Sequence, residues 1–123
     1  MYEVEIISSF AAAHKLRQYK GKCERLHGHN YKVHVTARAS STKSDGMVID
    51  FGILKSITNE ILERLDHNFL NEIKPFDEIE PSAENIAAFI FFEVERCLEG
   101  HAALLYSVGV WESDTSIARY IRE

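Results

Sequence analysis

The sequence predicts an α+β fold in which two helices pack on one face of a four-stranded antiparallel sheet, in the order β-β-α-α-β-β. Three observations support this prediction: alternating apolar residues before position 40, two later segments with apolar residues three and four positions apart, and two short apolar segments near the C-terminus. Such a sheet buries the face that its helices cover. A chain of 123 residues can bury its own core, and we expect one domain over residues 1–123.

The first two predicted strands form a hairpin. Residues 2–14 begin with apolar positions and end in small residues. Residues 29–39 alternate most regularly, with apolar side chains at every second position: Tyr31, Val33, Val35 and Ala37. The two strands are therefore expected to be antiparallel neighbours, with turn-forming residues over 40–46.

Two helices follow, each with a predicted N-cap. Asp50 can accept hydrogen bonds from the first-turn amides of a helix with the apolar stripe Phe51, Leu54, Ile57, Ile61 and Leu65. Ser82 can cap a second helix, which ends at Gly100. The side chains of this helix that are expected to face the core are Ile86, Phe89, Ile90, Val94 and Leu98. Residues 66–81 are predicted to be irregular, and residues 103–112 and 116–121 to be the closing strands.

Composition argues against several classes of protein. A net charge of −5 is unlike that of a dedicated nucleic-acid binder, which usually has a basic face. No apolar run approaches the ~20 residues that span a membrane, and the N-terminus has no signal-like segment, so we expect a cytoplasmic protein. Cys23 and Cys97 are the only cysteines, so no disulfide framework is expected, and Cys97 is interpreted as a small buried residue.

One window of the chain is strongly basic. Between residues 15 and 25 the only acid is Glu24, and the basic residues are Lys15, Arg17, Lys20, Lys22 and Arg25. Such a window is either a solvated loop or a binding site for a compact polyanion such as a triphosphate.

Three histidines indicate a metal site. His27 and His29 are two residues apart at the start of the second strand, so their side chains project to the same face. Gly28 lets the backbone bend closely around an ion. His14 ends the first strand, which the hairpin places beside the second. Three imidazoles without a fourth protein ligand are typical of a catalytic zinc site, whose open position takes water or substrate.

Four further residues are candidates for the chemistry. Cys23 is either the fourth ligand of a closed structural site or, as we favour, a thiol activated by nearby positive charge to act as a base or nucleophile. Asp66 and His67 are either an ordinary helix end or an acid/base pair in which the carboxylate orients the imidazole. Glu112 follows an apolar segment and needs a partner with two adjacent N–H donors, such as a pterin or guanine ring.

These residues resemble the 6-pyruvoyltetrahydropterin synthase / 6-carboxytetrahydropterin synthase family. The resemblance covers nearly the whole chain and rests on six segments in the family's order: 10–14 (FAAAH), 23–29 (CERLHGH), 50–51 (DF), 65–67 (LDH), 81–85 (PSAEN) and 111–112 (WE). The close spacing of the cysteine and the His-Gly-His run is more similar to the bacterial and archaeal 6-carboxytetrahydropterin synthases than to the animal pyruvoyl enzymes.

The resemblance implies a T-fold subunit that assembles into a ring-like homohexamer with active sites at subunit interfaces. It implies that zinc is bound by His14, His27 and His29. It also implies a proton-transfer triad of Cys23, Asp66 and His67. Glu112 is the implied anchor for the pterin ring. The implied enzyme is a zinc-dependent lyase, 6-carboxy-5,6,7,8-tetrahydropterin synthase. Its substrate is a reduced pterin triphosphate, 7,8-dihydroneopterin triphosphate, and its reaction releases triphosphate and acetaldehyde on the route to 7-deazaguanine and queuosine.

Several alternatives stay open. Glu24 also stands three residues before His27, and some family members place a catalytic glutamate near there, so a dihydroneopterin side-chain lyase or the pyruvoyl-forming synthase are alternatives within the family. Outside it, a metal hydrolase also uses three histidines and water. A non-catalytic zinc-binding interaction module would instead have a closed four-ligand site and would unfold when the metal is removed.

Overall fold

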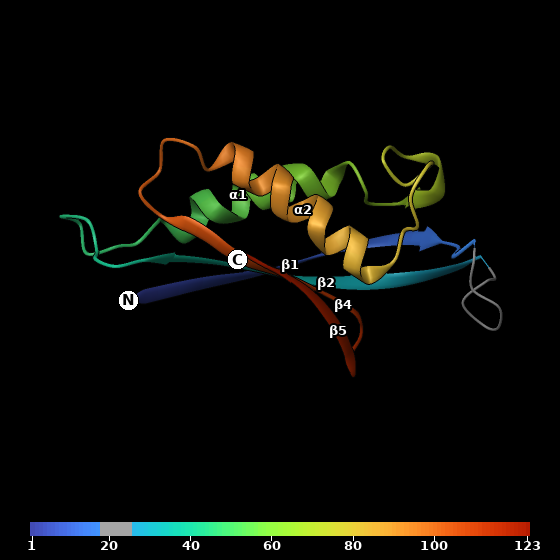
Figure 1. Ribbon diagram of the computed structural model, residues 1–123, viewed down its shortest axis with the longest axis horizontal. Coiled ribbons are helices and arrows are strands. Elements are labelled where there is room, and N and C mark those ends of the chain that lie inside the picture. The colour runs from blue at the N-terminus through green and yellow to red at the C-terminus, as the bar shows by residue number, and fades with distance from the viewer. Residues whose placement is uncertain (18–25) are drawn as a thin grey trace.

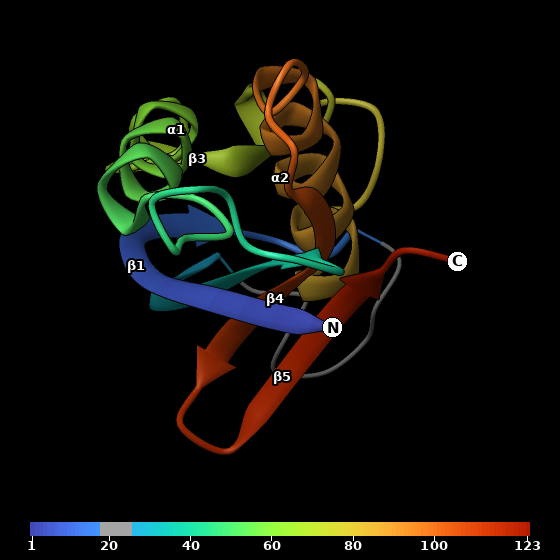
Figure 2. The same cartoon turned by 90° about the vertical axis from the view of Figure 1, so that its left-hand side faces the viewer.

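Helices cover one face of a twisted sheet, as Figures 1 and 2 show from two directions. A computed structural model gives the structure of the protein and describes residues 1–17 and 26–123. Along the chain the elements are β1 (Tyr2–His14), β2 (His27–Ala39), α1 (Phe51–Glu63), β3 (Asn68–Phe69), the 3₁₀ helix η2 (Leu70–Glu72), α2 (Ala83–Cys97), β4 (Leu104–Ser113) and β5 (Ser116–Ile121). The predicted α+β class, with α1 and α2 on the same side of the sheet, is confirmed.

The sheet has the strand order β3-β1-β2-β4-β5. β1 and β2 form the predicted antiparallel hairpin, in continuous register from Tyr2 opposite Ala39 to His14 opposite His27. The prediction of four antiparallel strands needs one correction, because β3 adds a fifth strand that pairs parallel with β1. A strand of two residues has no side-chain periodicity to reveal it, and it forms only because the tertiary fold brings it to the edge of β1.

Both predicted N-caps are confirmed. The Asp50 carboxylate accepts from the backbone N–H of Gly52 at 2.6 Å at the start of α1. The Ser82 hydroxyl accepts from the backbone N–H of Asn85 at 3.2 Å at the start of α2. These bonds satisfy donors that a helix leaves free in its first turn. They also fix where α2 begins, which matters for the site described below.

The core lies between the sheet and the two helices. Its largest fully buried side chains include Tyr31, Phe76 and Phe91. Two side chains differ from prediction: Phe51, in the first turn of α1, is 55% exposed, and Cys97, in the last turn of α2, is exposed rather than buried. No helix in residues 1–17 and 26–123 is long and apolar enough to cross a membrane.

Arg17, part of the basic window, binds a neighbouring loop, although its side chain is exposed. Its guanidinium donates to the carbonyl oxygens of Phe76 at 2.7 Å and Ile79 at 3.2 Å, and its backbone N–H donates to the Glu80 carboxylate at 2.7 Å. The loop before α2 is thereby tied to the end of β1. Arg17 is therefore a structural residue, whereas the other basic residues at positions 20, 22 and 25 lie outside the described part of the chain.

Candidate metal centre

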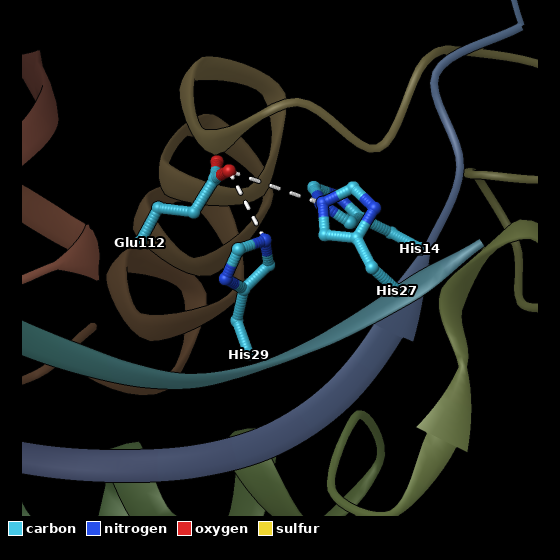
Figure 3. A group of neighbouring side chains, drawn as sticks. All are labelled: His14, His27, His29 and Glu112. Atoms are coloured by element: carbon cyan, nitrogen blue, oxygen red, sulfur yellow. Dashed lines mark hydrogen bonds and ion pairs between the residues drawn. The ribbon is translucent and has the colours of Figure 1, made fainter. Parts of the chain in front are cut away.

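The end of the β1–β2 hairpin gathers three imidazoles on the helix-covered face. His14 pairs with His27, and Ala12 pairs with His29, so all three histidines share the phase of the buried Tyr31. Glu112, near the end of β4, reaches the same place from the other side of β2. In Figure 3 the three rings and this carboxylate point toward one common space. The sequence prediction that His14 lies beside the other two histidines is confirmed.

The ligand atoms of these four residues all lie within 4.8 Å of one another. The Nε2 atoms of His14 and His27 are 3.1 Å apart. The Glu112 carboxylate lies 3.2 Å from Nε2 of His29 and 4.0 Å from Nε2 of His14. Nε2 of His29 is buried and makes no hydrogen bond to any residue in the described chain, because its contact with Glu112 has the distance but not the alignment of a hydrogen bond.

A backbone carbonyl fixes the tautomer of His14. Nδ1 of His14 lies 2.7 Å from the carbonyl oxygen of Pro81, which can only accept, so Nδ1 carries the proton. Nε2 of neutral His14 then presents its lone pair to the other three groups. Such an outer hydrogen bond orients metal-binding histidines in general. Pro81 immediately precedes the N-cap of α2, so this helix start positions a residue of β1.

Burial favours the neutral form of two of the imidazoles, those of His14 and His29. Desolvation is the main cause that lowers the pKa of His14 below its ordinary value, opposed by the Pro81 carbonyl and the Glu112 charge. Desolvation also lowers the pKa of His29, again opposed by Glu112. Neutral imidazole is the form that binds a metal ion. Both rings are thus ready to bind a cation at neutral pH without first losing a proton.

The residues present fit a divalent metal. Ligand atoms around tetrahedral zinc, with bonds of about 2.0–2.1 Å, lie about 3.3 Å apart, which is close to the two shorter contacts here. The buried Nε2 of His29 has no hydrogen bond to the described residues, and coordination of a metal ion would satisfy it. Imidazole and carboxylate are ordinary zinc ligands. His14, His27, His29 and Glu112 therefore form a group that could hold a metal ion.

A hollow of about 300 Å³ adjoins this group. It is lined by His29, Glu112 and Glu84, together with residues of β5 and of the β4–β5 turn. Glu112 is thus placed between the imidazoles and open space, where it can meet either an ion or a ring bound in the hollow. The sequence interpretation of Glu112 as a substrate anchor did not include its contact with the histidines.

Asp66 and His67 lie beside β1, just before the short strand β3. The Asp66 carboxylate accepts from the backbone N–H of Ala11 at 2.9 Å, and the backbone N–H of His67 donates to the Ala11 carbonyl at 2.6 Å. His67 lines a hollow of about 460 Å³ to which both strand phases contribute, Ala13 and Asn30 on one side and Ala12 and His29 on the other. His67 and one of the three clustered histidines therefore line the same hollow.

The pair itself has the geometry of an oriented imidazole. Asp66 lies 2.9 Å from Nδ1 of His67, which leaves Nε2 directed elsewhere. The Ala11 N–H, helped by the His67 contact, holds the pKa of Asp66 below its usual range. His67 has a φ of +58°, in the left-handed region that few non-glycine residues adopt. Backbone held in this way clusters at functional sites.

Sequence reasoning missed two residues that contact the site, and two of its own candidates lie outside the described residues. The Pro81 carbonyl and the Tyr31 ring contact the histidines, but a carbonyl has no side-chain signal and an apolar strand position indicates only core. Cys23 and its neighbour Glu24, the alternatives for the catalytic residue, lie outside the described residues.

Fold and site together define an α+β protein with a histidine-rich metal-binding group at the end of a β-hairpin. A family model described as 6-pyruvoyl tetrahydropterin synthase matches residues 3–123. The chain is 43% identical over 117 residues to the 6-carboxy-5,6,7,8-tetrahydropterin synthase of Synechocystis sp., covering 91% of this chain and 87% of that protein. It is 35% identical to the protein of the same name from Haemophilus influenzae, covering 98% and 99%.

A solved structure agrees with these sequence matches. The 6-pyruvoyl tetrahydropterin synthase of Caenorhabditis elegans superposes with a TM-score of 0.90 at 28% identity, covering 99% of this chain and 96% of that one. The chain belongs to the 6-pyruvoyl tetrahydropterin synthase family. Its relatives are pterin synthases, which supports an enzyme of the lyase type acting on a pterin.

Proposed function

We propose that this protein is a zinc-dependent 6-carboxy-5,6,7,8-tetrahydropterin synthase. It would convert 7,8-dihydroneopterin triphosphate to 6-carboxytetrahydropterin with loss of triphosphate and acetaldehyde, as a cytoplasmic step toward 7-deazaguanine and queuosine. The observation that carries the proposal is the convergence of three imidazoles and Glu112 beside a hollow. The names of the relatives from Synechocystis and Haemophilus influenzae favour the carboxy-forming branch.

The metal centre would consist of His14, His27 and His29, with Glu112 turned toward the substrate. Zinc bound there would supply positive charge that stabilises negative charge on the substrate side-chain oxygens. Glu112 would accept hydrogen bonds from two adjacent N–H groups of the pterin ring, for which a carboxylate with two acceptor oxygens is suited. Its position between His29 and the hollow supports this role.

Proton transfer would fall to Cys23 and His67. Asp66 holds Nδ1 of His67 at 2.9 Å, so Nε2 would be the atom that takes or gives the proton. Cys23 would act on the opposite face of the reacting carbon. Removing such a group ordinarily costs about 10²–10⁴ in rate.

The family resemblance supports an assembly in which active sites lie between subunits. The metal-binding group would come from one copy of the 123-residue domain, and Asp66 with His67 from another. A ring-like homohexamer would bring the two together. Because each interface repeats by symmetry, every copy would contribute to two sites, to one through its metal-binding group and to the other through Asp66 and His67.

The decisive experiment is a mass spectrum of the products formed from 7,8-dihydroneopterin triphosphate by the zinc-loaded protein. The proposal predicts 6-carboxytetrahydropterin together with acetaldehyde. Formation of 6-pyruvoyltetrahydropterin without acetaldehyde would identify the pyruvoyl-forming branch, and loss of the whole side chain would identify a lyase that uses Glu24. An inactive protein that unfolds on chelation would instead support a zinc-binding interaction module.

A further inference from the structure

Tyr31 carries a buried hydroxyl group that lacks a partner. The side chain is fully buried in the first half of β2, two residues after His29, and its hydroxyl makes no hydrogen bond to any residue within 1–17 and 26–123. A buried polar group without a hydrogen bond destabilises a fold, so each such group in a native structure needs an explanation.

Packing alone does not explain the hydroxyl. The Tyr31 ring stacks on Phe10, with centroids 4.8 Å apart and an angle of 13° between the rings. Phenylalanine would make the same contact without an unsatisfied oxygen. The sequence therefore contains a hydroxyl group that no residue of the described chain binds.

The ring lies against the metal-binding group. Its centroid is 5.4 Å from that of His29 and 5.8 Å from that of His14, and both rings meet it at steep angles, 63° and 89°. Ala12, the small residue of β1 that pairs with His29, separates Phe10 from His14 along the same face. Tyr31 thus forms the floor of the site between the core and the imidazoles. The His29 ring, whose centroid lies 5.4 Å from that of Tyr31, also has a buried Nε2 without a hydrogen bond to the described residues.

We infer that Tyr31 is a positioning residue of the metal centre, whose hydroxyl forms its hydrogen bond only when an ion with an oxygen ligand, water or substrate, occupies the site. The inference rests on the metal binding of the proposed function. The edge-on ring contacts hold the planes of His14 and His29, and the hydroxyl stabilises the occupied state. Outer-shell partners of this kind are worth about 10–100-fold in metal affinity.

The test is the variant Tyr31→Phe, studied with and without cobalt(II), whose absorption bands report the geometry of its ligands. The metal-free variant should unfold at the same temperature as the parent protein or a higher one, because the unsatisfied hydroxyl is gone. Its cobalt affinity should be about tenfold weaker or more, and the cobalt bands should shift. A matched control is Tyr120→Phe, since Tyr120 packs on Phe91 and Phe92 away from the site and should leave cobalt binding unchanged.

The outcomes separate the inference from the proposed function. An unchanged cobalt affinity in Tyr31→Phe would overturn the inference. A lower unfolding temperature of the metal-free variant would also overturn it, because the hydroxyl would then have a partner in the empty protein. Failure of the parent protein to bind cobalt or zinc would overturn the proposed metal centre itself.

Discussion

The chemistry of the site depends on which nitrogen of each histidine is free. The Pro81 carbonyl accepts a hydrogen bond from Nδ1–H of His14, so Nε2 of His14 carries the lone pair and lies 3.1 Å from Nε2 of His27. Two ring nitrogens at this separation suit a shared cation, and burial lowers the pKa of His14 and of His29, which favours their neutral, metal-binding form. With His27 and the Glu112 carboxylate, these rings form a group that could hold a metal ion.

Replacing one imidazole should abolish tight metal binding without unfolding the protein. His29→Ala removes a proposed ligand whose side chain is 22% exposed, and should weaken zinc affinity by more than about 100-fold, since even outer-shell partners are worth about 10–100-fold. His34→Ala is the matched control, because His34 lies on the same strand in the opposite phase and contacts Glu5 at 2.9 Å. Competition with a zinc-sensitive dye measures the zinc affinity of both variants. Equal affinities of the two variants would show that His29 is not a ligand.

The metal-free protein should lose stability on acidification. The unfolded chain's histidines titrate near a pKa of about 6.5, whereas burial lowers the pKa of His14 and His29 in the fold. Below that pH the unfolded state binds more protons, so the contribution of these residues is complete above about pH 6.5 and is lost as the pH falls toward the lowered folded values. Urea unfolding at several pH values from 7.5 to 5 measures how steeply the free energy of unfolding falls with pH. His29→Gln should make this dependence shallower. An unchanged dependence would show that His29 does not have a lowered pKa in the folded protein.

Much of this residue-scale picture could be predicted from sequence, for a clear reason. The spacing of His27 and His29 fixes their common face, and a hairpin fixes the position of His14. The contact of Glu112 with His29 could not be predicted, because it depends on the register of β4 against β2. Tyr31 was assigned only to the core, since its alternation is the same as that of a packing residue.

Among the elements, α2 links stability to the metal centre through its first turn. Ser82 caps the helix, and the neighbouring Pro81 carbonyl binds His14. Ser82→Ala should lower the free energy of unfolding by about 1 kcal/mol, and should also weaken zinc binding because the carbonyl is less firmly placed. Asp50→Ala removes the cap of α1 and provides the control, with a similar loss of stability and unchanged zinc affinity. Denaturant unfolding and zinc titration of both variants check this, and equal zinc affinities would show that the cap does not act on the site.

The elements that sequence failed to predict are those without an internal pattern. β1, β2, both helices, β4 and β5 follow from apolar periodicity and capping residues, and their bounds differ from prediction by a few residues at most. β3 and η2 do not, because β3 pairs only through Ala12 and Ala13 and η2 has three residues. His67 directly precedes β3, and its backbone N–H donates to the Ala11 carbonyl of β1. The position of His67 therefore depends on tertiary contacts that the sequence pattern does not show.

For the whole molecule, the proposed chemistry is divided between two places on the chain. The metal-binding group lies at the end of the β1–β2 hairpin, and Asp66 and His67 lie beside β1 before β3. In the proposed assembly, a complete active site combines the metal-binding group of one copy with Asp66 and His67 of another.

Mixed assemblies test the shared site. His29→Ala and His67→Ala should each be inactive alone, because every site lacks one component. Assembled together in equal amounts, they should recover about one quarter of the parent activity, since random mixing gives that fraction of sites an intact component from each copy. Product formation from the reduced pterin triphosphate is the measurement. Mixed assemblies that stay inactive would place both groups of a site on one chain.

The central claim is that three imidazoles hold one zinc ion with an open position, and X-ray absorption spectroscopy of the zinc-loaded protein tests it most directly. The account predicts three imidazole nitrogens and oxygen at about 2.0–2.1 Å, with no sulfur. Glu112→Gln should give the same imidazole signal if this residue anchors the pterin rather than the metal. A sulfur neighbour at about 2.3 Å, or fewer than three imidazoles, would contradict the account and indicate a closed site that includes Cys23.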